Sequence, residues 1–135
     1  MISIGEYFGK WIEDADDNAL MRAGRLVDAV NRLMLMAEAD GVGFPTNPAT
    51  GSQVSGKEYG GFRPKSCPIG APNSKHKLGA AVDLFDPLGA IDSWAIGNLD
   101  RLKECGIYME HPDATPHWAH WSTIGPASGN RVFHP

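Results

Sequence analysis

The sequence lacks an excess of positive charge, a long hydrophobic run and a recognisable secretion signal, and each absence excludes a class of protein. Its 12 Lys and Arg are outnumbered by 16 Asp and Glu, so the net charge is -4 and nucleic acid is not expected as a partner. No apolar run approaches the ~20 residues that cross a bilayer, so no membrane insertion is expected. The first residues carry Glu6, with no basic start followed by an apolar core, which predicts synthesis in the cytoplasm without a signal peptide.

Cysteine is also scarce. Cys67 and Cys105 stand far apart in the chain, without the paired spacing of a thiolate metal site, and they predict two free thiols rather than a disulfide. The 135 residues correspond to one domain, residues 1–135, which is large enough to bury a core without disulfides.

Hydrophobic periodicity predicts a long helix in the first third of the chain. Asp16 and Asp17 stand where the helix N-terminus favours negative charge, and Gly41 ends the pattern. We assign Leu20 and Met21 to the packed core as well. The apolar residues with the spacing of one helix face are Leu26, Val30, Leu33 and Ala37.

The remaining elements predict an α+β fold, with helices packed on a small, mainly antiparallel sheet. Residues 42–75 have no sustained period and read as successive turns, with one short strand expected around residues 59–63. A second helix is expected from the Asp92–Ser93 cap to Gly106. Strands are expected over residues 80–86, 107–110 and 118–123, and the segment 132–133 is expected to attach the C-terminus to the body.

Candidate metal ligands come from two short windows of the sequence. Alternation along residues 80–86 places Asp83 inside an apolar strand, where a carboxylate is costly unless it is paired or binds a metal. His76 precedes it by a turn at Gly79, and His117 and His120 lie on a later candidate strand. Two His and one Asp form the three-ligand set of a catalytic zinc site, which is typical of hydrolytic chemistry.

The first window, Ser74-x-His76-x-x-Gly79-x-Ala81-x-Asp83, resembles the signature of the zinc D-Ala-D-Ala carboxypeptidase family. Relatives of that family include D-Ala-D-Ala dipeptidases, phage L-alanyl-D-glutamate endopeptidases and the signalling domain of hedgehog. The pair Trp118-x-His120 resembles the family's second motif, W-x-H. The segment 59–64 is similar to the upstream region that carries an arginine, and the segment 128–135 is similar to the tail of small phage-encoded members.

The resemblance implies a role for each matching residue and a zinc cleft across the sheet, of the hedgehog and D,D-peptidase type. His76, Asp83 and His120 would bind Zn²⁺. Arg63 would hold the substrate carbonyl oxygen as it becomes an oxyanion, and Ser74 would hydrogen-bond the substrate.

The general base is left open between two residues. Many relatives carry Asp or Glu three residues before the last zinc His, where this chain has His117. Glu110 ends a Y-x-E segment that resembles the one carrying the acidic residue in hedgehog-like members. We favour Glu110 as the base, with His117 orienting substrate or sharing the proton transfer and Asp113 a distant third.

The resemblance implies a zinc peptidase that hydrolyses a peptide bond of bacterial peptidoglycan, encoded by a phage or prophage. It would be a D,D-carboxypeptidase or an L-alanyl-D-glutamate endopeptidase. We expect a monomer that acts on cell-wall peptide after release or virion delivery. The alternative is a non-catalytic module that contains zinc and binds the wall or belongs to a virion.

Overall fold

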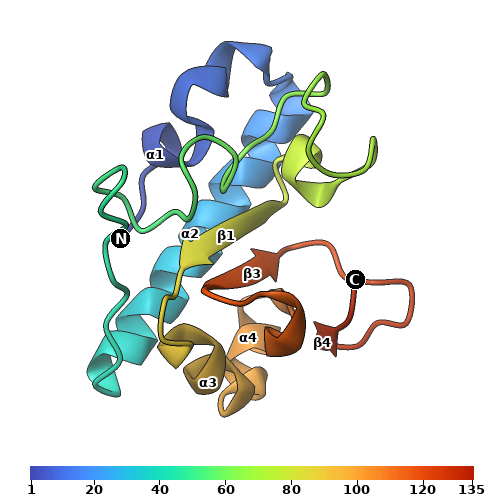
Figure 1. Ribbon diagram of the computed structural model, residues 1–135. Helices are drawn as coiled ribbons and strands as arrows, with labels where there is room; N and C mark the ends of the chain where they lie inside the picture. Colours follow the sequence, from blue (N-terminus) through green and yellow to red (C-terminus); the bar gives the residue numbers. More distant parts are fainter.

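A 23-residue helix, α2 (Asp17–Ala39), is the longest element of the computed structural model, which describes residues 1–135 (Figure 1). Asp16 caps the helix, because its side chain accepts a hydrogen bond from the Ala19 N–H at 2.8 Å. The predicted apolar face is buried, as expected. Leu20 and Met21 are exposed, so their assignment to the core was wrong: they lie on the solvent side of the first turns.

The sheet has four strands in the order β1-β3-β2-β4. The pairs β1–β3 and β3–β2 are antiparallel, whereas β4 runs parallel to β2, so the sheet is mixed. The two antiparallel pairs agree with the prediction. The parallel pair arises because the chain turns back after β3, so that β4 runs opposite to β3 and in the same direction as β2, which lies between them. The strands are β1 (Ala81–Phe85), β2 (Tyr108–Glu110), β3 (Trp118–Ser122) and β4 (Val132–Phe133).

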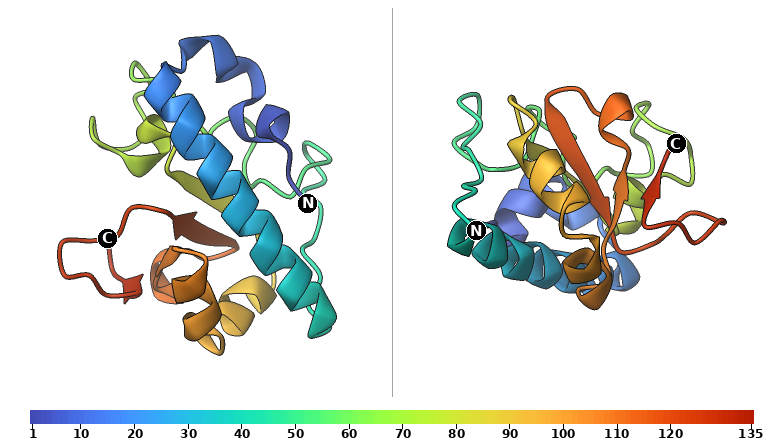
Figure 2. Two further views of the ribbon diagram at one scale, coloured as in Figure 1. Left: turned by 180° about the vertical axis from the view of Figure 1, so that it is seen from behind. Right: turned by 90° about the horizontal axis from the view of Figure 1, so that it is seen from below.

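Helix α2 lies across one face of this sheet, and their facing apolar side chains form one core (Figure 2). The short helix α1 (Ile4–Phe8) and the 3-10 turn η1 (Gly9–Asp14) precede α2. Tyr7 in α1 is fully buried and donates its hydroxyl to the Ala81 carbonyl at 2.9 Å. This contact ties the N-terminus to the start of β1.

The strand expected around residues 59–63 does not form, because this segment consists of turns and bends. Residues 53–60 of this loop still bind the outer edge of β1. The Asp83 N–H donates to the Gly60 carbonyl at 2.7 Å, and the Ser55 N–H donates to the Asp83 carbonyl at 2.8 Å. The loop therefore satisfies the outer edge of β1 without adding a regular strand.

The single helix expected from Asp92 to Gly106 is two helices, α3 (Ala90–Ile96) and α4 (Leu99–Glu104). The chain leaves helical hydrogen bonding at Gly97–Asn98, and Gly is the poorest ordinary helix former. The cap is also earlier than expected. The two carboxylate oxygens of Asp86 accept from the N–H groups of Ile91 and Asp92, each at 3.0 Å.

Gly79→Ala is expected to lower the free energy of unfolding by about 3 kcal/mol, because two costs combine at this position. Gly79 has φ +75°, and an added Cβ would lie 2.5 Å from the backbone oxygen of Ala19 in α2. Gly106→Ala is the matched control, since Gly106 has φ +71° with no atom within 4 Å of an added Cβ. Urea unfolding should show a loss of about 1–2 kcal/mol for Gly106→Ala. Equal losses in both variants would contradict the contact with α2.

Asp92→Asn is expected to stabilise the protein at pH 8 by about 1–2 kcal/mol, and by little at pH 4. Burial and the nearby Asp86 raise the pKa of Asp92 to about 7, although the Thr115 hydroxyl opposes this shift. Between pH 4 and 7 the folded chain holds a proton that the unfolded chain has lost, so stability falls as the pH rises through this window. Urea unfolding of metal-free wild type and variant at both pH values measures this, and a difference independent of pH would contradict it.

Candidate metal centre

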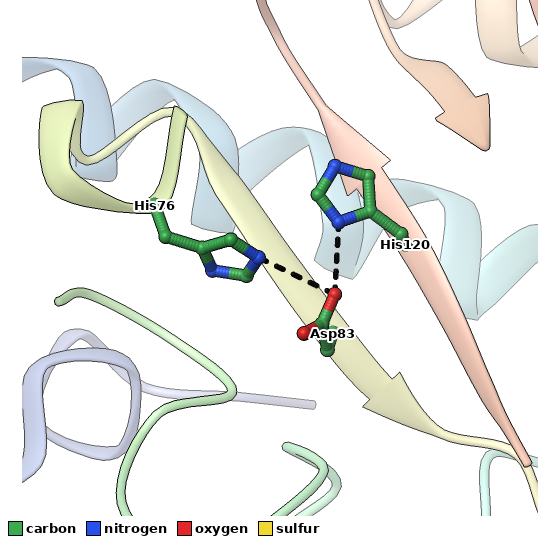
Figure 3. Close-up of side chains that lie close together, drawn as sticks. All are labelled: His76, Asp83 and His120. Atoms are coloured by element: carbon green, nitrogen blue, oxygen red, sulfur yellow. Dashed lines mark hydrogen bonds and ion pairs between the residues drawn. The ribbon is translucent and has the colours of Figure 1, made fainter. Parts of the chain in front are cut away.

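The three predicted ligands come from three elements that meet beside β1. His76 lies in the 3-10 turn η2 (Lys75–Leu78), which Gly79 ends in the left-handed region. Asp83 is the central residue of β1, and His120 is its direct partner on the antiparallel strand β3. The ladder register therefore brings Asp83 and His120 together, and the turn at Gly79 returns His76 to them (Figure 3).

Both imidazoles point at one carboxylate oxygen (Figure 3). Asp83 Oδ1 lies 3.4 Å from His76 Nε2 and 2.9 Å from His120 Nδ1. All three side chains are at least 86% shielded from solvent, with exposed fractions of 5%, 14% and 9%. The donor atoms lie within 4.8 Å of one another, so the buried group could hold a metal ion.

Surrounding groups fix the donors in the form that a metal needs. His76 Nδ1 lies 2.8 Å from the Gly61 carbonyl, which orients the ring so that Nε2 faces Asp83. Arg63 donates from Nη2 to the other carboxylate oxygen, Asp83 Oδ2, at 3.4 Å, and from Nε to the Tyr59 carbonyl at 2.8 Å. Hydrogen bonds of this kind, from groups that do not touch the metal, hold imidazole and carboxylate ligands in the orientation that a metal requires.

The electrostatics favour an ionised Asp83. Burial alone would raise the pKa of Asp83, but the charges and hydrogen bonds of His76 and His120 outweigh it, and the pKa lies well below its usual range. An ionised carboxylate and two imidazole nitrogens are a donor set that suits zinc, and three protein ligands leave a position for water or substrate. The residues present could therefore hold a metal ion such as zinc.

A cavity of about 500 Å³ opens directly over these residues. Glu110 lies in its wall with 17% of its side chain exposed, and its Oε1 is 3.9 Å from His120 Nε2. Ser74 also lines this cavity. A second cavity, of about 490 Å³, is lined by residues 55–60 and shares Arg63, Asp83 and Trp118 with the first. Two cavities therefore adjoin the candidate metal centre.

His117 and Asp113 are not brought to this cavity. His117 lies in the turn after Pro116 with φ +76°, and its exposed ring has Nδ1 3.4 Å from the Pro87 carbonyl. It borders a different hollow, next to Asp92. Asp113 has 83% of its side chain exposed, and its Oδ2 lies 3.4 Å from His111 Nδ1. Of the candidate bases, only Glu110 lines the cavity over the ligands.

Sequence reasoning missed two contributors to the site. The Gly61 carbonyl orients His76, and close packing requires glycine there, because an added Cβ would lie 2.0 Å from the Tyr7 carbonyl oxygen. The Gly60–Gly61 pair indicates such a close approach, whereas the sequence pattern of this segment predicts turns and a short strand. Phe133 from β4 also lines the cavity, with Lys75 Nζ 4.6 Å from its ring centre. That contact depends on the parallel pairing of the tail.

The cysteines and the helices bear on two further predictions. Both cysteines are free, as predicted. None of the helices has the length and apolar character needed to cross a membrane. Comparisons with family models, with curated proteins and with solved structures find no match to this chain.

Proposed function

We propose that this protein is a zinc-dependent peptidase that hydrolyses peptide bonds of bacterial peptidoglycan, with a fold of the hedgehog and D,D-peptidase type. The observation that carries the proposal is the convergence of His76, Asp83 and His120 beside a cavity that also holds Glu110. The resemblance of the window from Ser74 to Asp83 to the D-Ala-D-Ala carboxypeptidase signature supports the choice of substrate.

His76 Nε2, Asp83 Oδ1 and His120 Nδ1 would hold the zinc ion. Bound there, zinc supplies Lewis-acid chemistry, which polarises a carbonyl and makes water a better nucleophile near neutral pH. Glu110 is the general base: its Oε1 accepts the proton of the attacking water and later passes it to the leaving amine nitrogen. Its shielded position in the cavity wall supports this role over that of His117.

Arg63 and Ser74 position the substrate. The Arg63 guanidinium is fixed by Tyr59 and Asp83, so it presents a preorganised positive charge beside the ligands, where negative charge develops on the carbonyl oxygen. Ser74 lines the same cavity and offers a hydroxyl to the peptide backbone. Two cavities that share Arg63, Asp83 and Trp118 offer room for substrate beside the ligands.

The same proposal predicts the oligomeric state of the protein and where it acts. We expect a monomer, encoded by a phage or prophage, that reaches the cell wall through a lysis pore or with a virion.

Mass spectrometry of peptidoglycan digests tests the proposal. Zinc-loaded protein should release new fragments, and chelation should prevent their release until zinc is restored. Fragments cut between L-alanine and D-glutamate identify an endopeptidase, whereas loss of a terminal D-alanine identifies a carboxypeptidase. An unchanged digest from protein with zinc still bound would overturn the enzymatic function and favour the non-catalytic wall-binding or virion module.

A further inference from the structure

We propose that His111, Asp113 and His134 form a second metal site, which takes a divalent transition metal such as zinc and fastens the C-terminal segment to the body. Their donor atoms lie within 4.8 Å of one another, just beyond the ends of β2 and β4, and β4 is at the sheet edge opposite β1. The three residues are outside the proposed catalytic centre, and the inference does not depend on the proposed function.

The fold brings this group together through the parallel pairing of β2 and β4. Beyond the last strand pair, the His111 N–H donates to the Phe133 carbonyl at 2.7 Å, so His134 follows directly beside His111. Their rings are stacked, with centres 4.5 Å apart and planes inclined by 17°. The 3-10 turn η3 (Pro112–Ala114) then returns Asp113 to the same place. Backbone hydrogen bonds therefore hold residues from distant parts of the sequence at metal-binding range.

The donor types and spacing suit a metal. Two imidazoles and a carboxylate are a zinc or copper donor set. Asp113 Oδ2 lies 3.4 Å from His111 Nδ1, close to the ~3.3 Å between donors that each lie about 2.0 Å from a tetrahedral zinc ion. His111 Nδ1 also accepts a hydrogen bond from the Asp113 N–H at 3.1 Å, which identifies it as the unprotonated, ligand-competent nitrogen.

The second site should be weaker than the first. Its carboxylate side chain is 83% exposed and that of His111 is 36% exposed, against 5–14% at the first centre. The stacked rings must turn from their present arrangement to aim at one ion, and the Asp113 N–H must give up its contact with Nδ1. Solvent access and this rearrangement lower affinity, so a metal here should exchange while the metal at the first centre is retained.

The site has a structural consequence for the cavity. His134 stands between Phe133 and Pro135, which both line the cavity over the first centre. Glu110 is the direct strand partner of Phe133. A metal bound to His134 and His111 would hold this wall in place, so occupancy should slow hydrogen exchange of the His111 amide that donates to Phe133.

Calorimetric titration of metal-free protein with Zn²⁺ alone tests the second site. Wild type should bind two zinc ions in two classes, with His120→Ala losing the tight class and His134→Ala weakening the other at least tenfold. Asp113→Asn should weaken the same class. His117→Ala is the control for an exposed histidine outside the group, and it should leave both classes unchanged.

Hydrogen exchange supplies the second readout. Saturating zinc should slow the His111 amide in wild type and not in His134→Ala, which has lost an exposed side chain and should fold normally. A single zinc class in wild type that His120→Ala removes and His134→Ala leaves unchanged would overturn the inference. So would a second class that survives both His134→Ala and Asp113→Asn, because it would then be adventitious binding elsewhere.

Discussion

His120→Ala is expected to remove tightly bound zinc and to abolish measurable peptide hydrolysis. The variant leaves two of the three donors of the first centre, His76 and Asp83. Loss of a group that only hydrogen-bonds to a ligand typically lowers metal affinity 10–100-fold, so loss of a ligand itself should lower the affinity by more than about 100-fold. It also removes the imidazole that holds Asp83 Oδ1 at 2.9 Å.

Metal analysis after dialysis measures this effect, followed by the digestion assay on the same samples. His117→Ala is the matched control because it removes an imidazole near the start of the same strand, but from outside the cavity. It should keep the tight zinc ion and the activity. Full zinc retention by His120→Ala, with a normal circular dichroism spectrum, would exclude His120 as a ligand.

Glu110→Gln is expected to slow hydrolysis by about 10²–10⁴-fold while the tight zinc ion stays bound. The amide keeps the size of the side chain and its place in the cavity wall, but it cannot accept a proton. Because Glu110 Oε1 lies 3.9 Å from His120 Nε2, outside hydrogen-bonding range, its replacement should disturb the ligands little. The loss should therefore fall on kcat rather than on metal affinity.

Single-turnover hydrolysis with zinc-loaded variants is the measurement. Glu104→Gln makes the same chemical change at an exposed position in α4 and should leave the rate unchanged. Full activity in Glu110→Gln, together with a large loss in His117→Ala, would exchange the roles assigned to these two residues.

Much of the first centre could be predicted from local sequence. A strand alternates its side chains, so an Asp between apolar residues of β1 had to leave the core face or be paired there. Glycine at position 79 indicated the turn that returns His76 to this strand, and the structure places an α2 carbonyl where a side chain would begin. The register that sets His120 opposite Asp83 depends on pairing across 37 residues, and only the family resemblance selected His120 over His117.

Other features could not be predicted because they depend on long-range contacts. The turn segment 53–60 binds the edge of β1 through backbone atoms alone, so no pattern of side chains in the sequence predicts this pairing. The start of α3 depends on Asp86, whose carboxylate accepts from the N–H groups of Ile91 and Asp92, so the helix begins before the Asp92–Ser93 cap that local rules favoured. The sequence already favours Glu110 over His117 as the base, but only the structure places His117 outside the cavity, with its ring near the Pro87 carbonyl.

Anomalous diffraction from crystals of zinc-loaded protein, recorded on both sides of the zinc absorption edge, shows whether these three residues bind zinc. We predict a strong peak at about 2.0–2.2 Å from His76 Nε2, Asp83 Oδ1 and His120 Nδ1, with room for water or substrate towards Glu110. Zinc that binds the chain without any peak among these three atoms would contradict this prediction.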